Sequence, residues 1–295
     1  MSSQSETPIV HFDAYTGPEM AKRALASGEA KAKLPFLTTL LLGLLAGAYV
    51  ALAGVFYTIV ITDNSFGYGV TRLLGGLAFS LGLILVVVGG AELFTGNTLI
   101  FMGWLSSRVR TGRLLRNWAI VYLGNLLGSL MIVGMVSQTN HFSLNSYMVG
   151  ATAVKIALTK VHLPWASVFF SAILCNALVC LAVWLCYSAR TTTDRIMAII
   201  FPITAFVAAG FEHCVANMYF IPLGIIAALD PNVVAAFGKP VEGLSVETFV
   251  VNNLIPATLG NIVGGSLIIG AVYWVAYLLP EHRRARCAQN PEECE

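Results

Sequence analysis

The sequence alternates long apolar stretches with short polar ones. No charged side chain occurs in the four ranges 34–62, 117–140, 163–189 and 248–280. Each range is longer than the roughly 20 residues that a helix needs to cross about 30 Å of hydrocarbon. The pattern therefore predicts four transmembrane helices.

Two further apolar ranges carry titratable groups near their centres. Glu92 is the only charged residue in the range 73–107, and Glu212 and His213 are the only acidic, basic or histidine residues in the range 196–229. A charged group in the middle of a membrane-length segment is costly and points to a functional site. Each range is also too long for one plain helix, and a helix break is tolerated only where protein or water satisfies the freed backbone groups. We therefore expect two broken helices whose breaks lie in the interior.

The distribution of positive charges decides whether each of these ranges crosses the membrane once or twice. With one crossing each, the chain has six spans, and all but four of its 17 lysine and arginine residues lie on the side of the termini. With two crossings each, the same residues divide almost evenly. Since cytoplasmic loops are enriched in lysine and arginine, we expect six spans in a bacterial cytoplasmic (inner) membrane, with both termini cytoplasmic. The four residues left outside are Arg72, Lys155, Lys160 and Lys239.

Two short motifs recur in the same order in both halves of the chain. Glu92-Leu-Phe-Thr-Gly-Asn97 matches Glu212-His-Cys-Val-Ala-Asn217, and Leu123-Gly-Asn-Leu-Leu-Gly-Ser129 matches Leu259-Gly-Asn-Ile-Val-Gly-Gly265. Chance similarity of such short motifs is the alternative to a true repeat. Three crossings per half make the second copy inverted, and inverted repeats with discontinuous helices point to a translocation site near the midplane. We expect an all-α integral membrane protein of six transmembrane helices, built as two inverted three-helix repeats with helices 2 and 5 broken.

These patterns divide the chain into three parts. We expect a cytoplasmic N-terminal segment over 1–33, a channel domain over 34–280 and a cytoplasmic tail over 281–295. The first repeat covers about 34–140 and the second about 163–280. The N-terminal segment has no short apolar core before a small-residue cleavage site, so we expect no cleaved signal peptide.

The composition agrees with a membrane protein whose partner is the lipid bilayer. Apolar residues make up 57% of the chain and charged residues only 11%, with a mean hydropathy of +0.77. Soluble domains average about 25% charged residues. The sequence has no run of basic residues long enough to bind nucleic acid, so we expect no nucleic-acid partner. The six cysteines show neither a disulfide framework nor metal-ligand spacing, so we expect no metal and no other cofactor.

Small residues and asparagines in the spans are expected to serve packing. Glycines in the first and last spans would let helix backbones approach closely; they are Gly43, Gly47, Gly54, Gly260, Gly264 and Gly265. Asn125 and Asn261 lie in the second repeated motif. We expect them to hydrogen-bond across helices or to the freed backbone at the breaks.

The breaks hold the candidates for chemistry. His213 is the strongest, because an imidazole titrates near neutral pH and can exchange a proton with a weak acid or hydrogen-bond an anion. Thr95 could face it across the pseudo-twofold axis, or could cap the following half-helix. Glu92 and Glu212 fit better as acceptors for the unwound backbone or the asparagines. Lys160 could concentrate anions, or could simply anchor its helix at the membrane interface.

Four motifs together resemble the formate/nitrite transporter family, and the likeness extends from about residue 21 to residue 279. The motifs are Gly90-Ala-Glu-Leu-Phe-Thr-Gly-Asn97, Leu174-Cys-Asn-Ala-Leu-Val-Cys-Leu-Ala-Val-Trp184, Gly210-Phe-Glu-His-Cys-Val-Ala-Asn-Met218 and Asn253-Leu-Ile-Pro-Ala-Thr-Leu-Gly-Asn261. Within the family, Ile221-Pro-Leu-Gly-Ile225 and Asn253-Leu-Ile-Pro256 look most like the formate channels. Gly96-Asn97-Thr98 departs from the serine or threonine of some formate channels, which leaves the substrate open.

The resemblance implies an aquaporin-like protomer in a homopentamer, with one pore in each protomer. It implies that the pore and substrate residues are His213, Thr95, Asn176 and Lys160. It implies apolar constrictions formed toward the outside by Phe79, Leu83 and Phe206, and toward the cytoplasm by Leu93, Phe94 and Val179. Structural roles at the breaks fall to Glu92, Asn97, Glu212 and Asn217.

Taken together, the sequence favours a pH-dependent channel or transporter for formate or a similar small monovalent anion, with nitrite and hydrosulfide as alternatives. Lys160 would draw the anion in, and a proton relayed through His213 would let the neutral acid pass a constriction that opposes ions. The rival class is a membrane enzyme that uses Glu212 and His213 as an acid/base pair. No nucleophile motif, metal-ligand cluster or nucleotide loop accompanies that pair.

The N-terminal segment could form a helix of its own. Within 18–33, Met20, Ala24 and Leu25 lie on one possible helical face.

Overall fold

The computed structural model describes residues 13–63, 65–280 and 282–283, and within these ranges the chain is helical with no strand. Most of the predicted tail over 281–295 lies outside the described residues. In chain order the elements are α1 (Gly17–Lys33), α2 (Phe36–Ile61), α3 (Tyr68–Gly89), α4 (Phe94–Asn97), the 3-10 turn Thr98–Ile100, α5 (Phe101–Leu105), α6 (Thr111–Ser137), α7 (Met148–Val161), α8 (Trp165–Ser188), α9 (Thr192–Ala209), α10 (Cys214–Ala227), α11 (Pro231–Phe237), α12 (Val246–Thr248), the π-helical segment Phe249–Leu254, α13 (Ile255–Ile262), and the π-helical segments Val263–Ala271 and Trp274–Leu278.

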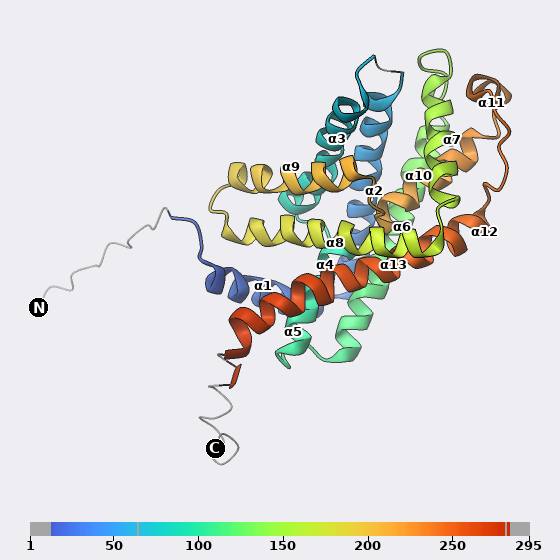
Figure 1. Cartoon of the computed structure of the whole chain (residues 1–295). Helices are drawn as coiled ribbons and strands as arrows, with labels where there is room; N and C mark the ends of the chain where they lie inside the picture. The colour runs from blue at the N-terminus through green and yellow to red at the C-terminus, as the bar shows by residue number, and fades with distance from the viewer. Residues whose placement is uncertain (1–12, 64, 281, 284–295) are drawn as a thin grey trace, which may run out of the picture.

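Six helical stretches of the described chain are long and apolar enough to cross a membrane, namely α2, α3, α6, α8, α9 and Val246–Leu278. The fold predicted from the sequence, with six spans and two broken helices, is therefore confirmed. Figure 1 shows α1 and α5 at one end of the molecule and α7 and α11 at the other. We call these ends the α1 side and the α7 side.

The two broken spans stop and restart in the same way. The first runs from α3 through a break into α4, and the second runs from α9 through a break into α10. The glycine that ends each first half, Gly90 or Gly210, is left-handed, with φ of 76° and 78°. In each break the amide that follows the glycine donates to the carbonyl five residues earlier, at 2.9 and 3.0 Å. This is the hydrogen-bond pattern of a glycine-terminated helix. It ends both helices at equivalent positions of the two repeats.

Two short helices, α1 and α7, occupy matching places in the halves, because each directly precedes the first span of its repeat. One face of α1 is buried in the described structure, including Met20, Ala24 and Leu25, so the face expected from the sequence is confirmed. The ring of Tyr15 lies between the guanidinium groups of Arg23 and Arg190, 3.9 and 3.8 Å from its centroid. Cation–π contacts on both faces of the ring fix the start of α1 to the loop after α8.

Glycines let the spans of each repeat pack backbone against backbone. A Cβ on Gly47 of α2 would overlap the backbone of Asn125 in α6, and a Cβ on Gly128 would overlap the carbonyl of Leu44. In the second half, a Cβ on Gly264 would overlap the carbonyl of Ile173 in α8. The close packing predicted for small residues is therefore present in both repeats.

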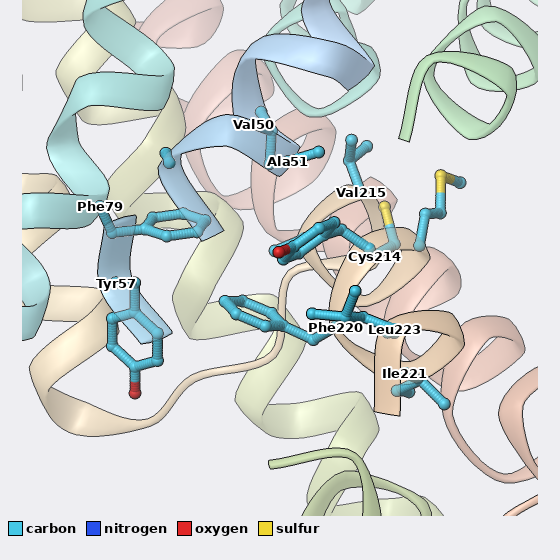
Figure 2. Packing of buried hydrophobic residues seen from close by; sticks show 14 of the residues in the cluster. Val50, Ala51, Tyr57, Phe79, Cys214, Val215, Phe220, Ile221 and Leu223 are labelled. Carbon is cyan, nitrogen blue, oxygen red and sulfur yellow. The ribbon is translucent and has the colours of Figure 1, made fainter. Parts of the chain in front are cut away.

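Between the halves lies a buried apolar cluster in which aromatic rings from three elements meet. Figure 2 shows Tyr57, Phe79 and Phe220 close together, beside Cys214 and Val215 of α10. The Tyr57 ring meets the other two edge-on at centroid distances of 6.2 and 5.5 Å. Edge-to-face packing adds specificity to burial. It fixes α3, which ends at the first break, against α10, which begins after the second break.

Candidate functional site

Two cavities enter the molecule from opposite ends without meeting. The α1-side cavity has a volume of about 470 Å³ and is bordered by residues of the first break, among them Glu92 and Leu93. The α7-side cavity has a volume of about 970 Å³ and is bordered by residues of the second break, among them Glu212 and His213. The two cavities share no bordering residue. The protein between them is the candidate functional site.

The centre of this site is a buried contact between the two breaks. The Oγ1 atom of Thr95 lies 3.0 Å from the Nε2 atom of His213, and both residues are buried. The placement expected for Thr95, facing His213 across the axis, is what the structure has. The alternative, a helix cap, is wrong, because Leu93 occupies the N-cap position of α4.

His213 itself caps the helix that follows it. Its Nδ1 atom accepts a hydrogen bond of 3.0 Å from the backbone amide of Ala216, in the first turn of α10. A neutral imidazole has one donor and one acceptor nitrogen. Since Nδ1 is the acceptor, neutral His213 carries its proton on Nε2 and donates it to the Thr95 hydroxyl. The hydroxyl proton of Thr95 is then left to donate elsewhere.

Asn176 fixes the backbone around Thr95 from α8. Its Nδ2 atom lies 3.2 Å from the Thr95 carbonyl, 3.1 Å from the Thr98 hydroxyl and 2.6 Å from the Asn261 carbonyl. The Thr98 hydroxyl in turn donates to the Thr95 carbonyl over 2.6 Å. Asn176 is buried and borders neither cavity. In this conformation the Asn176 side chain contacts the backbone of the first break and does not face a solvent-filled space.

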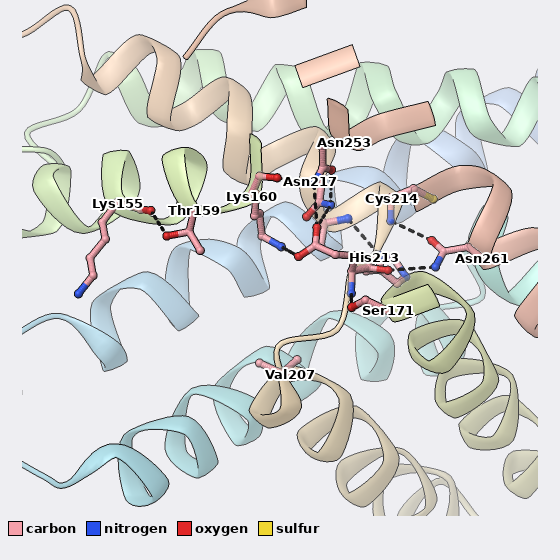
Figure 3. A network of polar contacts seen from close by, with 12 residues as sticks. Lys155, Thr159, Lys160, Ser171, Val207, His213, Cys214, Asn217, Asn253 and Asn261 are labelled. Carbon is pink, nitrogen blue, oxygen red and sulfur yellow. Dashed lines mark hydrogen bonds and ion pairs between the residues drawn. The ribbon is translucent and has the colours of Figure 1, made fainter. Parts of the chain in front are cut away.

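On the α7 side, three residues surround the Glu212 carboxylate, namely Lys160, Asn217 and Asn253, all labelled in Figure 3. Lys160 donates to Oε1 over 2.8 Å, while Asn217 and Asn253 donate to Oε2 over 2.7 and 2.9 Å. Asn217 also donates to the Asn253 side chain over 2.6 Å. Lys160 is therefore paired with a carboxylate, and the asparagines are the partners of Glu212. We call these four residues the α7-side cluster.

The same combination of one lysine, one glutamate and two asparagines meets on the α1 side. Lys31 lies 2.9 Å from Glu92 Oε1, and Asn97 donates to Glu92 Oε2 over 2.6 Å. Asn97 also donates to the Asn117 side chain over 3.0 Å, and the Asn117 amide donates to the Lys31 carbonyl over 3.1 Å. In the α7-side cluster, Asn253 donates to the corresponding lysine carbonyl over 3.2 Å. Four contacts therefore recur in both the α7-side cluster and this α1-side cluster. The hydrogen bond from Asn253 to Glu212 has no counterpart among the described residues of the α1 side, where Lys31 instead donates to the Asn97 side chain over 2.9 Å.

Asn125 and Asn261 tie the breaks to the neighbouring spans. Asn125 donates to the carbonyl of Glu92 over 3.0 Å and accepts from the amide of Phe94 over 2.9 Å. Asn261 donates to the carbonyl of Glu212 over 3.0 Å and accepts from the amide of Cys214 over 2.9 Å. Each asparagine thus satisfies one freed carbonyl and one freed amide, which confirms the expectation from the sequence.

The six residues expected to form constrictions fall into three groups. Phe79 and Phe206 border the α7-side cavity, and Phe206 stacks on the His213 ring with a centroid distance of 5.9 Å. Leu83, which the resemblance assigns to the outer constriction with Phe79 and Phe206, borders the α1-side cavity together with Leu93. The other two, Phe94 and Val179, are buried and border neither cavity.

Sequence reasoning missed three members of the clusters. Asn117 and Asn253 each lie eight residues before the asparagine that ties its break, Asn125 or Asn261. Extending the repeated motif backwards would have found both. Lys31 carried no comparable signal, because its distance along the chain to Glu92 differs from that between the corresponding residues of the second half.

No metal site accompanies these groups. Within the described ranges, no three histidine, cysteine, aspartate or glutamate side chains lie close enough together to hold a metal ion. The buried cysteines of the spans, Cys175, Cys180, Cys186 and Cys214, are free thiols. The polar groups at the breaks therefore serve one another and the backbone.

Comparison with known proteins identifies the family. A family model described as formate/nitrite transporter matches residues 18–275. The formate channel FocA of Haemophilus influenzae is 44% identical over 256 residues, 85% of this chain and 89% of that protein. FocA of Escherichia coli is 40% identical over 273 residues, 90% of this chain and 96% of that protein. A solved structure described as a pentameric formate channel with formate bound aligns with a TM-score of 0.76 at 43% identity, covering 82% of this chain and 98% of that one. This chain belongs to the formate/nitrite transporter family.

Proposed function

We propose that the protein is a pH-dependent channel for formate, assembled as a homopentamer with one pore in each protomer. Formate and the pentamer are supported by the FocA relatives and the solved pentameric formate channel. Nitrite is the alternative within the same family, and hydrosulfide is a second alternative anion. Membership of a transporter family excludes the membrane enzyme with Glu212 and His213 as an acid/base pair.

We assign the α1 side to the cytoplasm and the α7 side to the outside of a bacterial inner membrane. All four lysines and arginines expected outside, Arg72, Lys155, Lys160 and Lys239, border the α7-side cavity. Arg23, Lys31 and Arg195 border the α1-side cavity. The excess of positive charge on the side of α1 supports cytoplasmic termini.

The observation that carries the proposal is the Thr95–His213 contact between two cavities that do not meet. A substrate that crosses from one cavity to the other has to pass this buried pair. The pair presents one hydroxyl donor in apolar surroundings, with the Phe206 ring stacked on the imidazole. Such a site favours a small solute that can accept a hydrogen bond and shed its charge.

The hydrogen bonds of His213 define what a proton relay requires. A second proton on the imidazole would sit on Nδ1, where the Ala216 amide already donates. Two donors cannot face each other, so protonation has to release the cap of α10. We propose that His213 donates to Thr95 in its neutral form, and that proton transfer to a passing formate is coupled to a transient opening of this cap.

Lys160 takes a different part from the one expected from the sequence alone. Because its ammonium group is paired with Glu212 at 2.8 Å, its charge is largely offset at the cavity wall. We propose that Lys160 holds the second break in place and contributes less to attracting anions than an unpaired cation would. His213, Thr95 and Asn176 remain the proposed pore residues.

The test is formate uptake into proteoliposomes over a range of pH. His213→Phe should abolish pH-dependent uptake, because the phenyl ring can neither donate to Thr95 nor carry a proton. His162→Phe is the matched control, since His162 is exposed at the end of α7 and should leave uptake unchanged. Pentamer formation of both variants is checked by gel filtration. Undiminished pH-dependent uptake by His213→Phe would disprove the relay, and a panel with nitrite and hydrosulfide identifies the preferred anion.

A further inference from the structure

Arg72 of α3 reaches the second break and enters the wall of the α7-side cavity. Its Nε and Nη2 atoms donate to the carbonyls of Ala208 and Val207, over 2.8 and 3.0 Å. These carbonyls belong to the last turn of α9, directly before the break. Gly210 allows this approach, because a Cβ at that position would lie 2.6 Å from Nη2. Arg72 is thereby fixed beside the second break by two neutral acceptors.

No carboxylate among residues 13–63, 65–280 and 282–283 pairs with Arg72. Among the described residues, its contacts are the two α9 carbonyls and the face of the Tyr68 ring, 5.9 Å away. The acidic groups that border the same cavity have other partners: Glu212 pairs with Lys160, and Asp63 accepts from Asn145 over 3.2 Å. Lys155 and Lys239 are exposed, so within the described part of the cavity wall Arg72 is the half-buried cation that has no carboxylate partner.

The guanidinium also retains unused hydrogen-bond donors. A guanidinium has five N–H groups in one plane, and two of them serve the α9 carbonyls. The Nη1 atom makes no hydrogen bond to the described protein. Two parallel N–H groups on the remaining edge match the two oxygens of a planar anion, the geometry in which arginine binds carboxylates. A lysine in the same place would offer a point charge without this fork.

We propose that Arg72 forms a binding site for a small planar anion with two oxygens, a carboxylate such as formate or the similarly shaped nitrite, in the α7-side cavity. The site lies in the same cavity wall as Phe206 and His213, so a bound anion waits before the Thr95–His213 contact. This inference rests on the proposed function for the identity of the anion. It goes beyond it by assigning the waiting position to Arg72 and not to the paired Lys160.

The experiment measures binding separately from transport. The full-length protein in lipid nanodiscs is titrated with carbon-13 formate at neutral pH, and line broadening of the formate signal reports the bound fraction. For the wild type we expect broadening that sodium nitrite reverses and that the same concentration of sodium chloride does not. Arg72→Gln should weaken apparent binding by at least about tenfold, the loss expected for a bidentate charge-assisted pair.

Three further variants make the result specific. Arg72→Lys retains the charge but not the fork, so binding should fall between that of the wild type and that of Arg72→Gln. Lys155→Gln removes an exposed cation from the same cavity and should change binding by less than about twofold. His213→Phe should retain wild-type binding although uptake is lost.

Each outcome decides between the two proposals. Arg72→Gln binding within about twofold of the wild type, or displacement of formate by chloride as readily as by nitrite, would overturn the Arg72 site. If the wild type takes up no formate while its binding still depends on Arg72, the proposed function fails and the site stands. If Arg72→Gln does not assemble, formate binding by Arg72→Lys is compared with binding by Lys155→Gln. Weaker binding by Arg72→Lys supports the Arg72 site, and equal binding by the two variants overturns it.

Discussion

The Nε2 atom of His213 lies 3.0 Å from the Oγ1 atom of Thr95, and this contact joins the two halves of the chain at their breaks. The tautomer set by the α10 cap makes His213 the donor and leaves the Thr95 hydroxyl free to donate to a substrate. Each residue comes from a different repeat, and neither has an equivalent at the matching position of the other half. The centre of the molecule is therefore where the internal symmetry is broken.

Thr95→Val should lower formate uptake by about tenfold, because it removes the hydroxyl and leaves a buried imidazole N–H without an acceptor. Thr95→Ser keeps the hydroxyl and should retain most of the rate. Stopped-flow uptake in proteoliposomes measures both variants. Equal rates for Thr95→Val and the wild type would show that the hydroxyl takes no part in passage.

Glu212→Gln should destabilise the protein by about 3–5 kcal/mol, because it leaves the Lys160 ammonium without its carboxylate in a largely buried site. The side chains of Lys160 and Glu212 are only 16% and 2% exposed. Glu92→Gln is the matched change in the α1-side cluster and should cost less, since the Lys31 side chain is 30% exposed and can turn to water. Thermal unfolding in detergent compares them. A larger loss for Glu92→Gln would contradict this ranking.

Gly90→Ala should destabilise the first break by about 1 kcal/mol, because alanine is strained at a φ of 76°. A methyl group at this position would contact nothing within 4 Å, so the loss reports the backbone alone. The control is Gly112→Ala in the first turn of α6, where the added methyl also meets nothing within 4 Å. That change should be neutral or slightly stabilising. Equal unfolding midpoints for the two variants would argue against strain at the break.

Gly128→Ala should prevent close packing of α2 and α6, because the new Cβ would overlap the Leu44 carbonyl, which cannot move without its helix. Gly134→Ala on the same helix places a methyl group in open space and should be tolerated. The fraction of protein that elutes as a folded oligomer in gel filtration tests the pair. Normal assembly of Gly128→Ala would mean that the helices can separate at little cost.

His141, in the loop between α6 and α7, should make stability depend on mild acidity. Burial lowers the pKa of its imidazole below the ordinary value, so the folded state favours the neutral form. The stability from this group is present above the ordinary pKa of about 6.5 and is lost as the pH falls through the lower folded-state pKa. His141→Gln should therefore lose less thermal stability than the wild type between about pH 7.5 and pH 5. Parallel losses in both proteins would exclude His141 as the cause.

The sequence was sufficient for the architecture because the breaks and the helix contacts rest on local patterns. A charged residue inside an apolar range marked each break, and the second repeated motif located Asn125 and Asn261 beside the broken segments. Glycine positions predicted close packing of the first and last spans, which the structure places against α6 and α8. The break motif and the motif with the asparagine each occur once in either half, so each structural feature is indicated twice in the same chain.

The site was less accessible because its contacts depend on packing between distant segments. Lys31 and Lys160 have equivalent roles, yet the sequence offered only a cation near each span, and for Lys160 it left attraction of anions and anchoring at the interface as the two interpretations. Arg72 is far from Ala208 in the chain, and no motif marks the hydrogen bond between them. The tautomer of His213 also depends on a single capping bond that no spacing rule predicts.

The meeting of two helix N-termini at the breaks has a consequence for ion selectivity. Helix α10 starts directly after His213, and α4 starts at Phe94 with Thr95 in its first turn, so both helices direct the positive ends of their dipoles at the Thr95–His213 contact. Each lysine–glutamate cluster at the flanks is neutral. We therefore expect the backbone dipoles to favour anions over cations at the midpoint, so that exchanging any one side chain changes the rate of passage without reversing the sign of the preferred charge.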